Sequence, residues 1–67
     1  MMLVKDIMLL IEDDVFIWIQ RNKGGRWTMP RKDIIKSDGE KEVIKIDVGS
    51  SKEYRRKEYY TITLYVD

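Results

Sequence analysis

The sequence predicts an all-β fold, a small five-stranded antiparallel barrel or curled sheet formed by a single domain over residues 1–67. Three observations support this fold class. β-Branched and aromatic residues, which favour strands, are concentrated in residues 15–21. Apolar and polar residues alternate with a period of two over residues 42–48 and 58–66, as in strands with one buried face. Residues typical of turns, namely Asn, Gly, Ser and Asp, separate these segments.

The first strand is expected within residues 3–12, LVKDIMLLIE, which are mostly apolar and have the length of a strand. A short helix is the alternative, because these apolar residues also recur at helical spacing. We favour the strand because a tight acidic turn, Asp13-Asp14, follows it and because the remaining patterning is β-like. Residues 15–21, VFIWIQR, form the second strand. Both of its faces are largely apolar, which predicts a central strand or a face that meets a partner.

Residues 22–25, Asn-Lys-Gly-Gly, predict a hairpin turn, since Asn and Gly adopt the positive φ angles that such turns require. The third strand, residues 26–29, pairs back on the second strand. It ends at Pro30, which has no amide proton for a central ladder. One short helical turn or a bend is expected near residues 30–36, and residues 37–39, Ser-Asp-Gly, form another turn.

The fourth strand covers residues 42–48 and is expected to be half buried, with Ile44, Ile46 and Val48 on one face. Residues 49–57 form a polar connector, which is either a loop or the projecting part of an extended hairpin. Five short strands with turns between them are similar in size to SH3-like and OB-like folds.

The last strand, EYYTITLYVD, carries two different rows of side chains. The row expected to face the core consists of Tyr60, Ile62, Leu64 and Val66. The alternate row is neither strongly apolar nor charged and consists of Tyr59, Thr61, Thr63 and Tyr65. Tyr and Thr are good strand residues on a solvent-facing surface, and they can also bind a partner by stacking and hydrogen bonding. We therefore take the second row as candidate partner-binding residues.

The composition argues against an enzyme. The chain has no histidine and no cysteine. It therefore lacks the commonest general base and the best nucleophile. It also cannot form disulfides or the common zinc-ligand sets. Gly24-Gly25 lacks the Lys-Ser/Thr that follows a phosphate-binding loop, and Asp13-Asp14 lacks the spacing of a calcium loop. We expect no catalytic residues, no metal site and no cofactor. Without disulfides or a bound metal, a chain this short needs a tight core or a partner subunit to be stable.

Basic residues are unevenly distributed, although the net charge is only +1. Residues 21–36 hold six basic residues against one acid, whereas residues 1–20 hold one against four. Basic side chains neutralise phosphates, and aromatic rings stack on unpaired bases. Two segments, RNKGGRWTMPRK and KEYRRK, combine both kinds of side chain. The candidate nucleic-acid-binding residues in them are Arg21, Lys23, Arg26, Trp27, Arg31, Lys32, Tyr54, Arg55, Arg56 and Lys57.

The two tryptophans are expected to have different roles. Trp18 lies in the most apolar segment and is expected in the core. Trp27 follows two glycines and is a neighbour of Arg26, so we expect it to be the exposed tryptophan that contacts a partner. Exposure of Trp27 is therefore a specific prediction about the binding surface.

These patterns favour a non-enzymatic binding protein, an accessory protein associated with single-stranded nucleic acid or RNA. The alternative is a protein-binding module, a homodimeric inhibitor or adaptor of the kind found in viruses or mobile elements. Tyr, Trp, Met and Arg, which are enriched at interface cores, support that alternative. Abundant Lys and Glu with one Asn and one Gln resemble thermophile composition, as in an archaeal source. AT-rich viral and bacterial genomes, which favour Lys and Ile codons, are the alternative explanation.

No membrane partner is expected. Acidic residues at 12–14 divide the longest apolar region, which leaves no segment long enough to cross a bilayer. The N-terminal residues also lack the basic region of a signal peptide. We expect a soluble protein in the cytoplasm.

Overall fold

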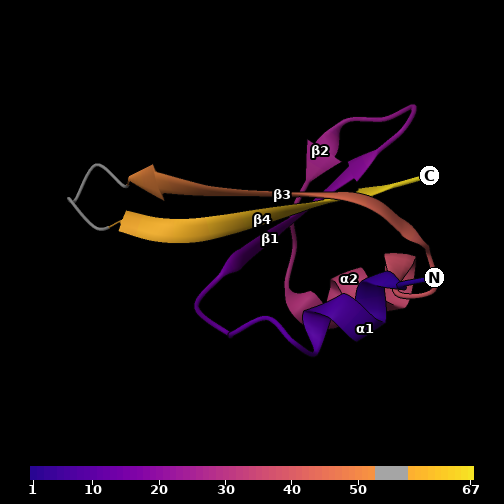
Figure 1. Cartoon of the computed structure of the whole chain (residues 1–67), viewed down its shortest axis with the longest axis horizontal. Coiled ribbons are helices and arrows are strands. Elements are labelled where there is room, and N and C mark those ends of the chain that lie inside the picture. Colours follow the sequence, from indigo (N-terminus) through magenta and orange to yellow (C-terminus); the bar gives the residue numbers. More distant parts are fainter. Residues whose placement is uncertain (53–57) are drawn as a thin grey trace.

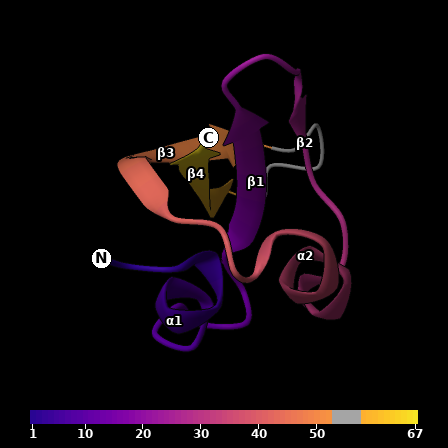
Figure 2. The ribbon, with the colours of Figure 1, turned by 90° about the vertical axis from the view of Figure 1, so that its right-hand side faces the viewer.

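The computed structural model describes residues 1–52 and 58–67, and the side chains of residues 1–50 and 59–67. The elements follow one another in the order α1 (Val4–Met8), β1 (Phe16–Arg21), β2 (Arg26–Trp27), α2 (Arg31–Asp38), β3 (Val43–Lys52) and β4 (Glu58–Val66). Both helices lie on the same side of the sheet that the strands form (Figure 1, Figure 2). Among the described residues, no helix is long and apolar enough to cross a membrane.

The strands form one mixed sheet in the order β2-β1-β4-β3. β1 pairs with β2 antiparallel and with β4 parallel, and β3 pairs with β4 antiparallel. β2 and β3 lie at opposite edges, so the sheet is open. A small β-rich fold is confirmed. Among the described residues the sheet has four strands instead of the predicted five, and the β1–β4 pair is parallel instead of antiparallel. Of the two predicted forms, barrel or curled sheet, the barrel is wrong. The hairpin predicted at residues 22–25 joins β1 to β2.

Residues 3–12 contain the helix α1 instead of the predicted strand. Val4, Ile7 and Met8 recur at helical spacing and are the buried residues of this helix. Backbone N–H groups at its start donate to carbonyl groups between α2 and β3. A helix of five residues is not stable by itself, so tertiary packing decides its conformation. The strand beside β1 on the side away from β2 is β4, from the other end of the chain.

The helical turn predicted near residues 30–36 is present and is longer than expected, because α2 continues to Asp38. Pro30 precedes the helix with an extended backbone (φ −52°, ψ 144°). Gly39 follows its last turn. A Cβ atom at Gly39 would collide with the carbonyl oxygen of Ile35, so a larger residue requires the backbone to shift.

The core lies between the helices and the inner face of β1 and β4. Its buried apolar residues are Val4, Ile7, Met8, Ile17, Ile19, Ile34, Leu64 and Val66. The row predicted to face the core from β4 is confirmed for Leu64 and Val66, and Ile62 packs against them while partly buried. Tyr60, in the same row, is 64% exposed.

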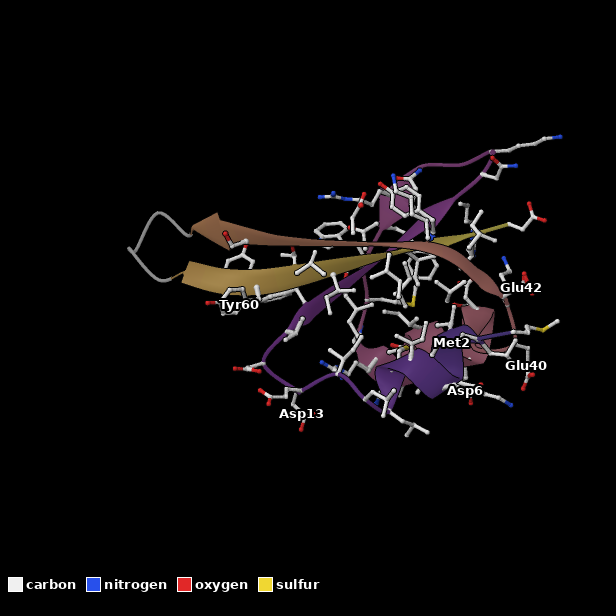
Figure 3. The ribbon with its side chains drawn as sticks, in the orientation of Figure 1. Met2, Asp6, Asp13, Glu40, Glu42 and Tyr60 are labelled. Atoms are coloured by element: carbon white, nitrogen blue, oxygen red, sulfur yellow. The ribbon has the colours of Figure 1, made fainter. Side chains whose placement is uncertain are left out.

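The β3–β4 hairpin is longer than the helix layer and extends beyond it (Figure 1). Residues 49–52 continue β3, so the extended hairpin is the correct alternative for the described part of the polar connector. Ile44, Ile46 and Val48 were expected on a buried face, but they are 61%, 46% and 74% exposed. Tyr60 points to the helix side of the sheet at a place that the helices do not reach (Figure 3). These side chains lack a covering layer.

Candidate nucleic-acid interface

The side of the sheet opposite the helices carries aromatic residues of β1 and β4 together with two basic residues, Arg26 and Lys45. In β1, Ile17 and Ile19 are buried, so the alternate residues point to the opposite side. The parallel register places this alternate row of β1 beside the Thr and Tyr row of β4. We call this side the open face. Its residues are Phe16, Trp18, Gln20, Arg26, Lys45, Asp47, Tyr59, Thr61, Thr63 and Tyr65.

Aromatic rings from two strands meet on the open face. The ring centroids of Phe16 and Tyr59 are 4.6 Å apart and their planes are tilted by 53°. Phe16 is 47% exposed although it is a large apolar residue. Trp18 lies one step further along β1, where it pairs with Thr63 and is only partly buried. A row of rings that are at least partly exposed on a sheet can stack on planar groups of a ligand.

Two cations lie over aromatic rings of the same face. The guanidinium carbon of Arg26 is 4.4 Å from the centroid of the Trp18 ring. The ammonium nitrogen of Lys45 is 4.9 Å from the centroid of the Tyr65 ring, and the Lys45 side chain is 62% exposed. Cation–π contacts of this kind hold the cations close to the rings while their charge stays accessible to solvent. A ligand with both flat groups and negative charges can use these pairs.

Tyr65 is fixed by Asp47. Its hydroxyl group donates a hydrogen bond of 2.8 Å to the Asp47 carboxylate. That hydrogen bond raises the pKa of Tyr65, and desolvation and the negative charge of Asp47 add to the increase. Tyr65 therefore stays protonated at neutral pH and holds its ring in one orientation. Lys45 Nζ is 3.8 Å from the same carboxylate, so Asp47 positions both members of the cation–π pair.

Small residues lie between the two aromatic groups. Thr63 is 7% exposed because Trp18 and Asp47 are its neighbours on the two adjacent strands. Thr61 pairs with Gly49, and a Cβ atom at Gly49 would come within 3.3 Å of the Thr61 hydroxyl oxygen. The four residues predicted to share one face of β4 do share it, and that face is the open face.

The structure places Arg26 on the open face but gives Arg21 a different role. Arg21 Nη2 lies 3.2 Å from a carboxylate oxygen of Asp38, whose side chain is fully buried. Lys41 Nζ is 2.8 Å from the other oxygen, and the Ser37 hydroxyl donates a hydrogen bond of 2.8 Å. Burial acts to raise the pKa of Asp38, but hydrogen bonds from Lys41, Ser37 and Arg21 outweigh it and the pKa is lowered. Arg21 thus joins β1 to α2.

Arg31 is likewise used within the fold. Its guanidinium donates to the backbone carbonyl oxygens of Met8, Ile11 and Val15 at 3.5, 2.8 and 3.1 Å, and also to that of Glu12. These carbonyls belong to the last residue of α1 and to the loop between α1 and β1, so Arg31 holds that loop to α2. Lys23 in the β1–β2 turn and Lys32 on α2 are exposed. The candidates Tyr54, Arg55, Arg56 and Lys57 lie outside the described residues.

The expected roles of the two tryptophans are reversed. Trp27 pairs with Ile19, so it lies on the helix side and packs against the core. The guanidinium of Arg21 covers its ring at 5.1 Å, and its buried Nε1 has no hydrogen-bond partner among the described residues. Trp18, expected in the core, lies on the open face. The register of each strand determines which tryptophan lies on the open face, and the polarity of the residues next to a tryptophan in the sequence does not.

The open-face residues that sequence reasoning missed include Phe16, Trp18 and Lys45. Strict alternation with Ile17 and Ile19 was the signal that could have assigned the first two, because two isoleucines form the more regular core row. Their proximity to Lys45 depends on β4 lying between β1 and β3, which local sequence does not reveal.

The described residues hold no group of three or more Asp and Glu side chains arranged to bind a metal ion. No protein-family model, curated protein or solved structure matches the chain, so the geometry described above is the basis for assigning a function.

Proposed function

We propose that this protein is a non-enzymatic accessory protein that binds single-stranded nucleic acid on the open face of its sheet. The observation that supports the proposal is the combination of partly exposed rings with cations held beside them, at Trp18 with Arg26 and at Tyr65 with Lys45. Stacking of one base on an aromatic side chain contributes about 1–3 kcal/mol and depends little on base identity. The proposed site therefore binds with limited sequence preference.

A single strand fits this face better than a duplex. Stacking on a sheet surface requires bases whose faces are free, as they are in unpaired DNA or RNA. A duplex would instead be bound through its phosphates, which requires a strongly basic surface. The open face carries two cations and one acid, Asp47, and the whole chain has a net charge of +1. The electrostatic contribution to binding is therefore small and the stacking contribution dominates.

Fluorescence anisotropy with a labelled single-stranded oligonucleotide tests the proposal. We expect binding at low salt, weaker binding to the matched duplex, and a shallow salt dependence. If Arg26 and Lys45 make the two phosphate contacts, log K falls with log salt with a slope of about −1.4. A steeper slope that becomes shallower in an Arg55→Glu, Arg56→Glu variant would add the second basic segment to the site. Absence of binding to any single strand at low salt would refute the proposal.

Substitutions on the two sides of the molecule provide the control. Trp18→Ala removes one stacking ring and should weaken binding by about 5- to 150-fold, which corresponds to 1–3 kcal/mol. Arg26→Glu should also weaken it. Lys32→Glu makes the same change in net charge on α2, away from the open face, and should leave affinity nearly unchanged. Equal losses in Arg26→Glu and Lys32→Glu would show that net charge, rather than this face, controls binding.

A protein-binding role is the second candidate. It is favoured by a different observation, the exposed apolar side chains along β3 and at the N-terminus, which include Ile44, Val48 and Met1. Contiguous exposed apolar patches of a few hundred square ångströms often mark protein interfaces. These residues do not belong to the open face, so the two roles use different surfaces.

A further inference from the structure

The outer edge of β3 is the second surface that requires an explanation. β3 is the last strand of the sheet, and β4 covers only one of its sides. The backbone N–H of Val43 donates to the carbonyl of Met2, which satisfies the first residue of the edge. Beyond it, the described part of the chain places no strand on this side of β3. A free edge of a long strand is a template for a further strand.

Apolar side chains accompany this edge on the helix side. Ile44, Ile46 and Val48 are 61%, 46% and 74% exposed, and Met1 and Met2 are 94% and 50% exposed. A hollow of about 620 Å³ beside β3 has a mixed lining, in which two charged residues accompany the apolar ones: Met1, Met2, Ile7, Glu42, Val43, Ile44, Lys45 and Ile46. The same strand therefore combines unpaired backbone with uncovered apolar surface, which is unfavourable for a monomer in water.

We propose that β3 pairs in antiparallel fashion with β3 of a second copy of this chain, with Ile46 opposite Ile46 at the two-fold axis. In a symmetric dimer, if residue i faces residue j then j faces i. Paired residues in an antiparallel ladder also lie on the same side of the sheet. The two-fold axis must therefore pass through a residue that faces its own copy, and the candidates for that residue can be compared one by one.

Charge complementarity selects Ile46. With Ile46 at the axis, Lys45 lies opposite Asp47 of the second copy and the reverse pair forms as well. Ile44 then lies opposite Val48 of the second copy, so apolar side chains meet on the helix side. Moving the axis by one residue places Lys45 opposite Lys45 or Asp47 opposite Asp47, and like charges directly opposite each other are destabilising. Within each chain, Lys45 and Asp47 already lie only 3.8 Å apart on one side of the strand.

The shape of the edge fits a short ladder. A register shift between Val43 and Lys45 marks a β-bulge, and β3 curves toward the helices at that end (Figure 1). Met2 and Glu42 lie at this curved start (Figure 3), so the N-terminal segment leaves the straight part of the edge open. A ladder this short would bury less than the roughly 1,200 Å² of total surface at which stable interfaces begin. We therefore expect a dimer that dissociates on dilution.

A dimer of this kind would extend the sheet from four strands to eight, with both open faces on the same side. The inference does not rest on nucleic-acid binding, although Lys45 and Asp47 belong to both surfaces, and its test uses the protein alone. Analytical ultracentrifugation from about 1 μM to about 1 mM should show a monomer–dimer equilibrium. A monomer over the whole range would overturn the inference.

Single cysteines test the register directly, because the native chain contains none. Residues directly opposite each other in an antiparallel pair have Cα atoms about 4.5–5.5 Å apart, which suits a disulfide. Ile46→Cys should therefore form a disulfide-linked dimer on mild oxidation. In Val48→Cys the two cysteines would be four residues out of register, roughly 13 Å apart along the strand, and should not. Val48 is the more exposed residue, so random collisions would favour the opposite result. Cross-linking of Val48→Cys at the same rate as Ile46→Cys would overturn the register.

A charge exchange provides the second test. Asp47→Lys places two lysines opposite each other on both sides of the axis and should weaken the dimer at least fivefold. The double substitution Lys45→Asp, Asp47→Lys restores opposite charges across the axis and should recover the wild-type dissociation constant. Near-ultraviolet circular dichroism checks that each variant is folded. Failure of the double variant to recover, with the fold intact, would contradict the proposed pairing.

Discussion

Replacement of Asp38 by Asn tests the charge cluster that joins β1 to α2. The Asp38 side chain is fully buried, whereas its partners Arg21 and Lys41 are 43% and 38% exposed. Asn keeps the size of the side chain and can still accept the hydrogen bond from Ser37. The substitution therefore removes the negative charge and leaves the packing of this site nearly unchanged.

The expected loss follows from the contacts of the carboxylate. Hydrogen bonds to charged groups contribute about 1.5–3 kcal/mol to stability, and neutral ones about 1 kcal/mol. The substitution therefore lowers the contribution of each of the two hydrogen bonds, from Arg21 and from Lys41, by about 1 kcal/mol. Removal of one member of a completely buried ion pair costs about 3–5 kcal/mol, but here both cations can return to water. We expect the free energy of unfolding to fall by about 2 kcal/mol. For a domain of this size, that corresponds to a decrease in Tm of roughly 8–16 °C.

The effect should depend on pH in a defined direction. The pKa of Asp38 is lower in the folded protein than the unfolded value of about 3.9, so the carboxylate stabilises the fold above that value. This stabilisation is lost as the pH falls through the folded pKa. The difference between wild type and Asp38→Asn should therefore be constant from about pH 5 to pH 7 and should shrink below about pH 4.

Urea unfolding followed by tryptophan fluorescence provides the assay, because Trp27 packs against the core. Glu40→Gln is the matched control, since it removes an acid from the exposed Lys5–Glu40 ion pair of 2.7 Å. We expect no measurable change in the control. A free energy of unfolding in Asp38→Asn equal to that of wild type at pH 7 would refute the reasoning, as would a difference that persists unchanged at low pH.

Three further predictions concern other parts of the molecule. Arg31→Ala should lower the free energy of unfolding by about 2–4 kcal/mol in urea titrations, because several backbone carbonyls lose their donor, and Arg31→Lys should recover less than half of that because it lacks the branched guanidinium. In a spectrophotometric titration of the tyrosines, Asp47→Asn should lower the pKa of Tyr65 toward its ordinary value, and an unchanged titration curve would contradict the Tyr65–Asp47 hydrogen bond. Gly39→Ala should lower the free energy of unfolding by about 1–3 kcal/mol because of the collision with Ile35, whereas Gly25→Ala, which meets no atom within 4 Å, should lower it less.

The pattern within a strand could be predicted from sequence because it is local. The two rows of β4 follow from a period of two, and the structure keeps Tyr59, Thr61, Thr63 and Tyr65 on one face. The hairpin at residues 22–25 was also predictable, since Asn and Gly suit a tight turn. Neither feature requires knowledge of distant residues.

The arrangement of the elements could not be predicted in the same way. Residues 3–12 fit both a strand and a helix, and the decision depends on β4 pairing with β1 from the opposite end of the chain. The role of Arg21 depends on α2 packing beside β1, which brings the buried carboxylate of Asp38 to it. The role of Arg31 depends on α2 packing beside the α1–β1 loop, whose carbonyl groups accept its hydrogen bonds. The apolar row of β3 has the pattern of a core face in the sequence, but the buried core consists of helix, β1 and β4 residues, and the β3 row stays exposed.

The measurement that tests the central claim most directly is a two-dimensional ¹H–¹⁵N spectrum of the indole region during titration with a single-stranded oligonucleotide. The chain has two tryptophans on opposite sides of the sheet, Trp18 on the open face and Trp27 against the core. If single-stranded nucleic acid stacks on the open face, the indole resonance of Trp18 should shift with increasing ligand while that of Trp27 stays in place. A shift of Trp27 alone, or no shift of either resonance at saturating ligand, would contradict the proposed function.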